Sequence, residues 1–263
     1  MRIDGWALRR CFRLYERLKT FKRRIRVRNR RYPTNLAPDG LPLPPVTLLV
    51  EVAGTADIAT FLEGGELAAQ TVRELLAAGG QPLDRCGAIL DFGCGCGRVL
   101  RQWKDLSATA FYGTDLNAEL VEWCSRQLPF ASVSVNTLEP PISFDNQSFD
   151  AIYAFSVFTH MPGDVQKRWL QEFLRILKPG GLLLFSTHGS CYAPRLRGDE
   201  RRQFLDGNLV VRFGSAAGSN LCGSFHPEAF VRRELAPGWE VAAFVPEGAR
   251  GNPRQDAWVF RRP

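Results

Sequence analysis

The clearest chemical pattern in the sequence is a glycine-rich stretch at residues 89–98, ILDFGCGCGR. Glycine stands at every second position of it, at 93, 95 and 97, after the acidic residue Asp91. Glycine allows a backbone to turn tightly and to approach a ligand closely. A dinucleotide-binding loop needs the spacing G-x-G-x-x-G, whose third glycine would fall on Arg98 or Leu100 here. The stretch therefore predicts a ligand other than a dinucleotide, with a tight turn that binds nothing as the alternative.

A second acidic residue, Asp115, lies in the next apolar run, FYGTDL at residues 111–116. A carboxylate has two oxygens and accepts hydrogen bonds from two neighbouring hydroxyl groups at once. The alternative is local, with Asp115 capping a helix that begins near Asn117. Its place at the end of the strand that follows the strand of Asp91 favours ligand binding.

The chain has three histidines, at 160, 188 and 226, and histidine is the side chain best suited to act as a base near neutral pH. We expect His160, which ends the stretch FDAIYAFSVFTH, to be the catalytic base. His188 and His226 are the next candidates for this role. A lone histidine is more often structural, and this alternative stays open for all three. The seven cysteines are scattered without C-x-x-C pairs, so no metal site is predicted.

These residues need a scaffold, and the chain from residue 88 onward alternates short apolar runs with helical segments. This alternation predicts a parallel sheet with helices on both faces. Residues 55–78 look like two helices broken at Gly64-Gly65, and Gly180 or Gly181 is expected to end the helix before the fifth strand. The predicted strands are 88–91, 111–115, 132–135, 151–155, 182–186, 240–245 and 257–261. The predicted helices lie near 97–106, 117–127 and 164–178.

The pattern D-x-G-x-G-x-G, with a second acid closing the next strand, resembles the class I S-adenosylmethionine-dependent methyltransferases. The resemblance covers residues 88–188 and extends more loosely to the C-terminus. It implies an α/β fold, a Rossmann-like seven-stranded sheet in a three-layer αβα sandwich. It also implies S-adenosyl-L-methionine as the cofactor, with Asp91 near its amino group and Asp115 on its ribose.

The same resemblance implies the remaining cofactor contacts. The glycine loop would wrap the methionine part, Asn136 would meet the adenine amine, and Leu116 or Leu138 would cover the ring. The family often has aspartate at this position, and Asn136 is a tolerated departure from it. An asparagine turn, which is common in loops, is the rival explanation for Asn136. The full set of expected cofactor-binding residues is Asp91, Gly93, Cys94, Gly95, Gly97, Asp115, Leu116, Asn136, Thr137, Leu138, Phe155 and Ser156.

The activity implied is methyl transfer to a small-molecule or carbohydrate-like acceptor. The methyl group of the cofactor is already activated, so alignment of the acceptor nucleophile with it supplies most of the catalysis. A fainter resemblance is to methyltransferases found with bacterial glycan-assembly enzymes. In residues 189–238, Tyr192, Arg195, Arg197 and Phe213 would suit an anionic or glycosylated acceptor, although solvated surface arginines are the commoner case. Two alternatives stay open: another reaction of the sulfonium, such as cyclisation releasing methylthioadenosine, and a non-catalytic binding module.

The formal charge of +7 is unevenly distributed. Residues 1–33 hold thirteen basic and two acidic side chains, a net of +11, so the remaining residues carry a net of −4. The body is therefore mildly acidic, which disfavours nucleic acid as a partner. Residues 6–27 have helical apolar spacing with arginines on the other face, which predicts a basic amphipathic helix. We expect its apolar side to pack on the rest of the protein or on a second copy, with binding to an anionic membrane surface as the second interpretation and RNA binding as the third.

The expected organisation is a basic amphipathic helix at 1–32, a proline-rich linker at 33–45, and a methyltransferase domain at 46–263 with an acceptor-side insertion at 189–238. A composition of 45% hydrophobic and 23% charged residues excludes wholesale disorder. No apolar run reaches the ~18 residues of a membrane span. Scattered cysteines and a charged N-terminus indicate the cytoplasm, or its face of the inner membrane.

Overall fold

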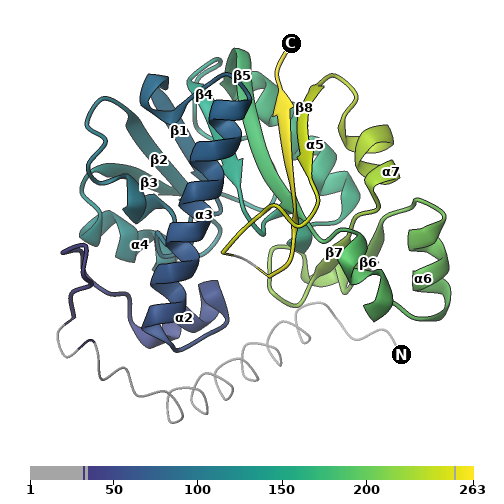
Figure 1. The fold of residues 1–263 in the computed structure, drawn as a ribbon, viewed down its shortest axis with the longest axis horizontal. Helices are drawn as coiled ribbons and strands as arrows, with labels where there is room; N and C mark the ends of the chain where they lie inside the picture. Colours follow the sequence, from purple (N-terminus) through teal and green to yellow (C-terminus); the bar gives the residue numbers. More distant parts are fainter. Residues whose placement is uncertain (1–31, 33–34, 252) are drawn as a thin grey trace.

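The computed structural model describes residue 32, residues 35–251 and residues 253–263; the predicted basic helix at 1–32 lies almost wholly outside them. A seven-stranded sheet in the order β3-β2-β1-β4-β5-β9-β8 forms the centre of the fold (Figure 1). The strands are β1 (Ala88–Phe92), β2 (Ala110–Asp115), β3 (Ala131–Val135), β4 (Phe149–Ala154), β5 (Leu177–Thr187), β8 (Glu240–Val245) and β9 (Asp256–Arg261). The helices are α2 (Val46–Ala53), α3 (Ile58–Ala78), α4 (Ala118–Gln127), α5 (Gly163–Ile176), α6 (Gly198–Leu205) and α7 (Glu228–Phe230).

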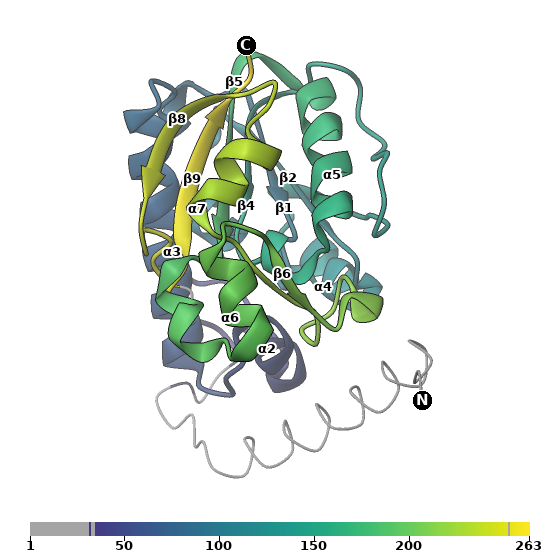
Figure 2. The ribbon, with the colours of Figure 1, turned by 90° about the vertical axis from the view of Figure 1, so that its right-hand side faces the viewer.

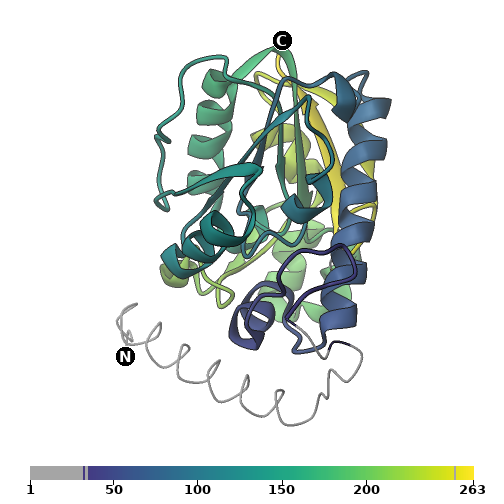
Figure 3. The same ribbon diagram turned by 90° about the vertical axis from the view of Figure 1, so that its left-hand side faces the viewer.

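Alternate residues of each central strand face opposite helical layers. Ile89 and Tyr153 pack in the core beneath α3, while Leu90 and Ile152 pack in the core beneath α5. Figure 3 shows α3 and α5 on opposite sides of the sheet. Because both faces are covered, the central strands β1, β4 and β5 are mostly apolar and buried. The predicted three-layer αβα sandwich with seven strands is confirmed.

The topology places the ends of β1 and β4 at the point where the strand order reverses. β1 pairs in parallel with both β2 and β4, and β9 pairs antiparallel with β5 and β8. In open α/β sheets, ligands bind outside the carboxyl ends of the strands at such a switch point. The glycine loop follows β1 and the segment leading to His160 follows β4, so both lie at this edge.

Three local expectations are corrected. α3 runs unbroken through Gly64-Gly65, because these glycines let it approach the glycine loop: a Cβ at Gly65 would lie 2.5 Å from the carbonyl oxygen of Arg98. The helix expected near 97–106 is reduced to a 3₁₀ turn at Leu100–Trp103. α5 ends at Ile176, and Gly180 lies inside β5 instead of ending the helix.

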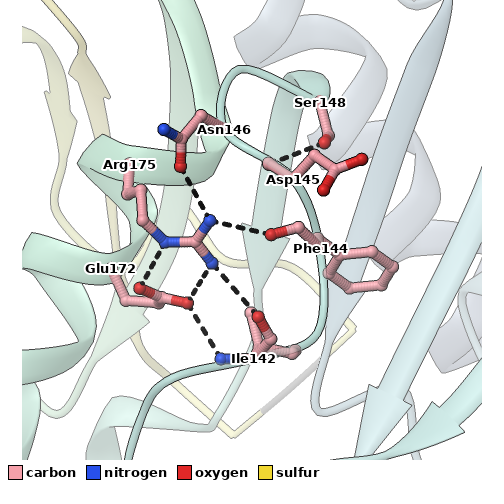
Figure 4. A network of polar contacts seen from close by, with 7 residues as sticks. All are labelled: Ile142, Phe144, Asp145, Asn146, Ser148, Glu172 and Arg175. Carbon is pink, nitrogen blue, oxygen red and sulfur yellow. Dashed lines mark hydrogen bonds and ion pairs between the residues drawn. The ribbon is translucent and has the colours of Figure 1, made fainter.

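The loop from β3 to β4 is fastened to α5 by Arg175 (Figure 4). The guanidinium pairs with Glu172 at 2.6 Å and donates to the carbonyl oxygens of Phe144 at 2.8 Å and Ile142 at 3.1 Å. The Glu172 carboxylate in turn accepts from the N–H of Ile142. This network holds the chain just before β4, at the edge of the sheet opposite the glycine loop. The charges of Arg175 and Glu172 are paired with each other and with the backbone there.

Residues 189–238 contain a second, two-stranded sheet. β6 (Val210–Arg212) and β7 (Gly223–Phe225) pair antiparallel, and α6 packs with them around a separate apolar cluster. In Figure 2, α6, β6 and α7 face the viewer.

The described part of the proline-rich segment, 35–45, packs on the domain. The carboxylate of Asp39 accepts from Nε and one terminal nitrogen of the buried Arg101, at 2.8 and 2.9 Å. No helix in the described ranges is long and apolar enough to cross a membrane.

Candidate functional site

The glycine loop after β1 has a backbone that only glycine adopts readily. Gly93, Gly95 and Gly97 have φ of +81°, +57° and +73°, in the left-handed region. A Cβ added at any of them would lie 2.3 to 2.8 Å from a neighbouring side chain. The N–H groups of Gly93 and Cys94 donate to the carbonyl oxygen of Thr114, at 2.8 and 2.9 Å, which ties the loop to the end of β2.

Asp91 is a buried carboxylate at the start of this loop. Its Oδ2 accepts from the hydroxyl of Tyr153 at 2.9 Å, and that hydroxyl accepts from Nε1 of Trp103 at 2.9 Å. No described residue donates to Oδ1. Burial raises the pKa of Asp91 to about 7, and the charge of Asp115 adds to this, against the hydrogen bond from Tyr153. A cation placed at Oδ1 would supply the missing partner.

Asp115, at the end of β2, directly contacts the glycine loop. Its Oδ2 accepts from the N–H of Gly95 and its Oδ1 from the N–H of Asn117, both at 2.9 Å. Burial raises its pKa in spite of these N–H donors. The cap of α4 is Asn117 itself, whose side chain accepts from the N–H of Glu119. Asp115 is therefore not the helix cap, and each of its carboxylate oxygens has a lone pair left.

The residues expected around adenine lie together, but Asn136 is engaged locally. Its Nδ2 donates to the carbonyl oxygen of Thr137 at 2.8 Å, and its backbone N–H donates to that of Asp115 at 3.1 Å. Leu116 and Leu138 converge beneath Gly218 of the insertion: a Cβ at Gly218 would lie 2.7 and 3.2 Å from their methyl groups.

At the end of β4, Phe155 is buried in the core beneath α3 and Ser156 has an unusual backbone, with φ of +58°. The N–H of Ser156 donates to Oγ of Ser186 at 2.8 Å, and its Oγ bonds the amide of Gln255. Ser186 and Gln255 are fully buried. Sequence reasoning missed both, and no local signal marks them, because they meet Ser156 only through the pairing of β5 with β9.

β7 brings the histidines together. Nδ1 of His160 lies 2.8 Å from the carbonyl oxygen of Cys222, and Nδ1 of His188 lies 3.2 Å from that of Ser224. A carbonyl oxygen only accepts, so each Nδ1 carries the proton and each Nε2 keeps its lone pair. The two acceptors are two residues apart, Cys222 just before β7 and Ser224 within it, and each imidazole keeps one basic nitrogen.

His226 has a different role. It is 1% exposed, and its Nε2 lies 3.1 Å from Oε1 of Gln166, whose amide nitrogen donates to Phe158 and Met161. Burial lowers the pKa of His226 to about 3 and that of His188 to about 4, and it also lowers the pKa of His160. All three are neutral at physiological pH, and His226 is too enclosed to meet a substrate.

Neither the cysteines nor a cluster of metal-ligating side chains forms a further site within the described ranges. The six cysteines found there are free, and five are buried. No group of three or more histidine, cysteine or acidic side chains in those ranges is arranged to hold a metal ion.

The sequence matches one family and several curated proteins over its central part. Residues 90–185 match the family described as "Methyltransferase domain". The chain is 30% identical over 116 residues to a malonyl-[acyl-carrier protein] O-methyltransferase of Enterobacter lignolyticus, covering 44% of this chain and 45% of that protein. It is 29% identical over 137 residues to a tRNA N(3)-methylcytidine methyltransferase of Schizosaccharomyces pombe, covering 48% and 44%. The chain thus spans less than half the length of these two relatives.

Solved structures share the fold at low sequence identity. The PH0226 protein of Pyrococcus horikoshii superposes with a TM-score of 0.54 and 16% identity, covering 74% of this chain and 89% of that one. Magnesium protoporphyrin IX methyltransferase of Synechocystis, solved with bound S-adenosylhomocysteine, has a TM-score of 0.54 and 15% identity, covering 77% and 86%. The architecture of this chain is therefore that of these proteins.

Proposed function

We propose that this chain, whose residues 90–185 match the methyltransferase domain family, is a class I S-adenosylmethionine-dependent methyltransferase. In this proposal it transfers a methyl group from S-adenosyl-L-methionine to a small-molecule or carbohydrate-like acceptor. The observation that carries the proposal is Asp91. This buried carboxylate has one oxygen without a donor among the described residues, at the switch point of the sheet. The relatives' own acceptors, an acyl-carrier substrate and a tRNA by their names, differ too much to identify the acceptor here.

The residues present fit this cofactor. The free oxygen of Asp91 suits the ammonium of its methionine part, because a charge-assisted hydrogen bond satisfies a buried carboxylate. The remaining lone pairs of Asp115 suit two ribose hydroxyls, and Leu116 and Leu138 give an apolar surface for adenine. When bound, S-adenosylmethionine supplies an activated methyl group.

The acceptor needs a base if its nucleophile is a hydroxyl, and we assign that role to His160. Its Nδ1 proton is committed to the carbonyl oxygen of Cys222, so Nε2 is oriented and unprotonated. Its lowered pKa, caused first by burial, keeps the imidazole neutral at physiological pH. A neutral imidazole accepts a proton from the acceptor hydroxyl at Nε2 as the methyl group is transferred.

The test has two parts. Calorimetry with S-adenosylhomocysteine measures cofactor binding, and methyl-labelled S-adenosylmethionine with a panel of hydroxyl-bearing small molecules and sugars measures transfer. His160→Asn keeps an N–H for Cys222 and removes the base, so transfer should fall by about 10²–10⁴-fold with binding unchanged. His188→Asn is the matched control, because a larger loss there would move the base to His188.

Incubation with S-adenosylmethionine alone tests the alternative chemistry. Methylthioadenosine formed without an acceptor would overturn methyl transfer. If the protein does not bind S-adenosylhomocysteine, the non-catalytic binding module is the one of the three hypotheses that remains. We further propose a cytoplasmic location, with residues 1–32 as a basic contact segment for a second copy or the inner membrane surface.

A further inference from the structure

Three rings form a cluster here called the aromatic trio: His188, directly after β5, and Tyr192 and Phe225 of the insertion. Ring centroids lie 4.2 Å apart for His188 and Tyr192, 5.4 Å for His188 and Phe225, and 5.8 Å for Tyr192 and Phe225. Tyr192 and Phe225 are buried and His188 is half-buried.

Two arginines cap the trio, and only one of them has an acidic partner. The guanidinium carbon of Arg212 lies 5.2 Å from the Phe225 ring centre, and Glu200 holds that guanidinium at 2.5 to 3.2 Å. The guanidinium carbon of Arg195 lies 4.8 Å from the Tyr192 ring centre. Arg195 is exposed and, among the residues that the structure places, has no carboxylate partner.

The charges around Arg195 leave room for an anion. The pKa of His188 is lowered first by burial and also by the charge of Arg195, against the hydrogen bond to the carbonyl oxygen of Ser224. None of the interactions acting on this pKa comes from a carboxylate of the described residues. Two acids, Glu247 and Asp256, act on the neighbouring Cys191, and both already have partners. Glu247 pairs with Arg254, and Asp256 accepts from the backbone N–H of Glu247. An anion beside Arg195 would therefore meet a cation that pairs with no carboxylate of the described residues.

We propose that Arg195, stacked on Tyr192, binds an oxyanion of the acceptor, a carboxylate or a phosphate, with the methylated end toward His188 and His160. A guanidinium presents a planar pair of donors that matches either oxyanion, and stacking on an aromatic ring pre-orients it. This assignment rests on the proposed function for its meaning, because it specifies the acceptor. The anion site itself can be tested without methyl transfer.

The test uses the full chain labelled with ¹³C at the histidine Cε1 position. Three histidines give three resonances, assigned with His160→Asn, His188→Asn and His226→Asn. Inorganic phosphate and acetate are titrated separately, which distinguishes the two oxyanions, and ethanol serves as the neutral control. We expect saturable movement of the His188 signal with one or both anions and no movement with ethanol.

The matched variants are Arg195→Gln and Arg201→Gln, the second an exposed arginine of α6. Arg195→Gln should weaken the anion response by about tenfold or more, and Arg201→Gln should leave it unchanged. An equal response in Arg195→Gln, or no saturable response of His188 in the unaltered protein, overturns the proposal. The unshifted His226 signal reports that each variant is folded. Normal S-adenosylhomocysteine binding without an anion response would reject the anion site alone.

Discussion

The Asp91→Asn variant distinguishes two effects of the buried carboxylate: its electrostatic cost to the stability of the fold and its contribution to cofactor binding. Asparagine has the same shape, and its Oδ1 still accepts from the Tyr153 hydroxyl, so the packing around it should persist. It carries no charge at any pH. Any difference from the unaltered protein that changes with pH therefore reports the ionisation of Asp91.

The magnitude follows from the pKa. Asp91 has its pKa raised by burial from 3.8 to about 7 in the folded protein. Between these values the unfolded chain has lost the proton and the folded protein keeps it, so rising pH destabilises the fold by about 1.4 kcal/mol per pH unit, and by about 4 kcal/mol in all. Above pH 7 the loss is complete. The variant escapes it, so its advantage in free energy of unfolding should grow by about 3 kcal/mol between pH 5 and pH 8.

The assay is urea denaturation of both proteins at pH 5, 6, 7 and 8, with Asp150→Asn as control. Burial acts to raise the pKa of Asp150, but the hydrogen bond from Lys178 and the N–H of Ala88 outweigh it and hold the pKa below 3.8. Asp150 is ionised in both states above pH 5, so the Asp150→Asn difference should be destabilising and constant with pH. A flat difference for Asp91→Asn over the same range would refute the buried-charge reasoning.

The same variant should lose cofactor. If the ammonium of S-adenosylhomocysteine meets Asp91, Asp91→Asn weakens binding by about 1–3 kcal/mol at pH 8. Binding to the unaltered protein should weaken by about tenfold from pH 8 to pH 6, because the carboxyl must first lose its proton. Unchanged affinity of Asp91→Asn for S-adenosylhomocysteine would show that Asp91 does not bind the cofactor. It would not affect the prediction about the pH dependence of stability.

Three further outcomes are expected. Asp115→Ala should weaken S-adenosylhomocysteine binding by about 1–3 kcal/mol in calorimetry, and unchanged affinity would remove the ribose assignment. Gly65→Ala places a Cβ 2.5 Å from the carbonyl oxygen of Arg98 and should cost about 1–3 kcal/mol in urea denaturation, whereas Glu66→Ala, exposed on the same helix, should change little. Removal of residues 1–31 should leave S-adenosylhomocysteine affinity unchanged, and its loss would make that segment part of the fold.

The sheet and the glycine loop were predictable because their signals are local. Buried strands are apolar runs, and a loop at positive φ needs glycine, so residues 89–97 describe their own conformation. The pairing of Asp115 with this loop also follows from topology, since β1 and β2 are neighbours in parallel. These features are properties of a few consecutive residues or of adjacent strands.

Other features depend on contacts between distant segments, which spacing does not reveal. Gly64-Gly65 lowers helix propensity and so predicts a break, but the close approach of Arg98 and Gly251 explains why glycine stands there in a continuous helix. The Tyr153 hydroxyl that partners Asp91 looks like an ordinary strand aromatic in the sequence. The spacing of the histidines likewise does not indicate which of them is enclosed. Gln166, from a distant segment, bonds His226 and separates it from the other two candidates for the catalytic base.

β7 links the two halves of the proposed reaction. The segment around this strand fixes the proton on Nδ1 of His160 and His188 through the carbonyl oxygens of Cys222 and Ser224. Just before the strand, the N–H of Gly218 donates to the carbonyl oxygen of His160, and a Cβ at Gly218 would meet the methyl groups of Leu116 and Leu138. A ligand that displaces Gly218 from the two leucines must therefore also act on the backbone that orients the base. Because the same insertion carries Arg195 and the aromatic trio, its conformation would bear on cofactor binding, base orientation and acceptor recognition together.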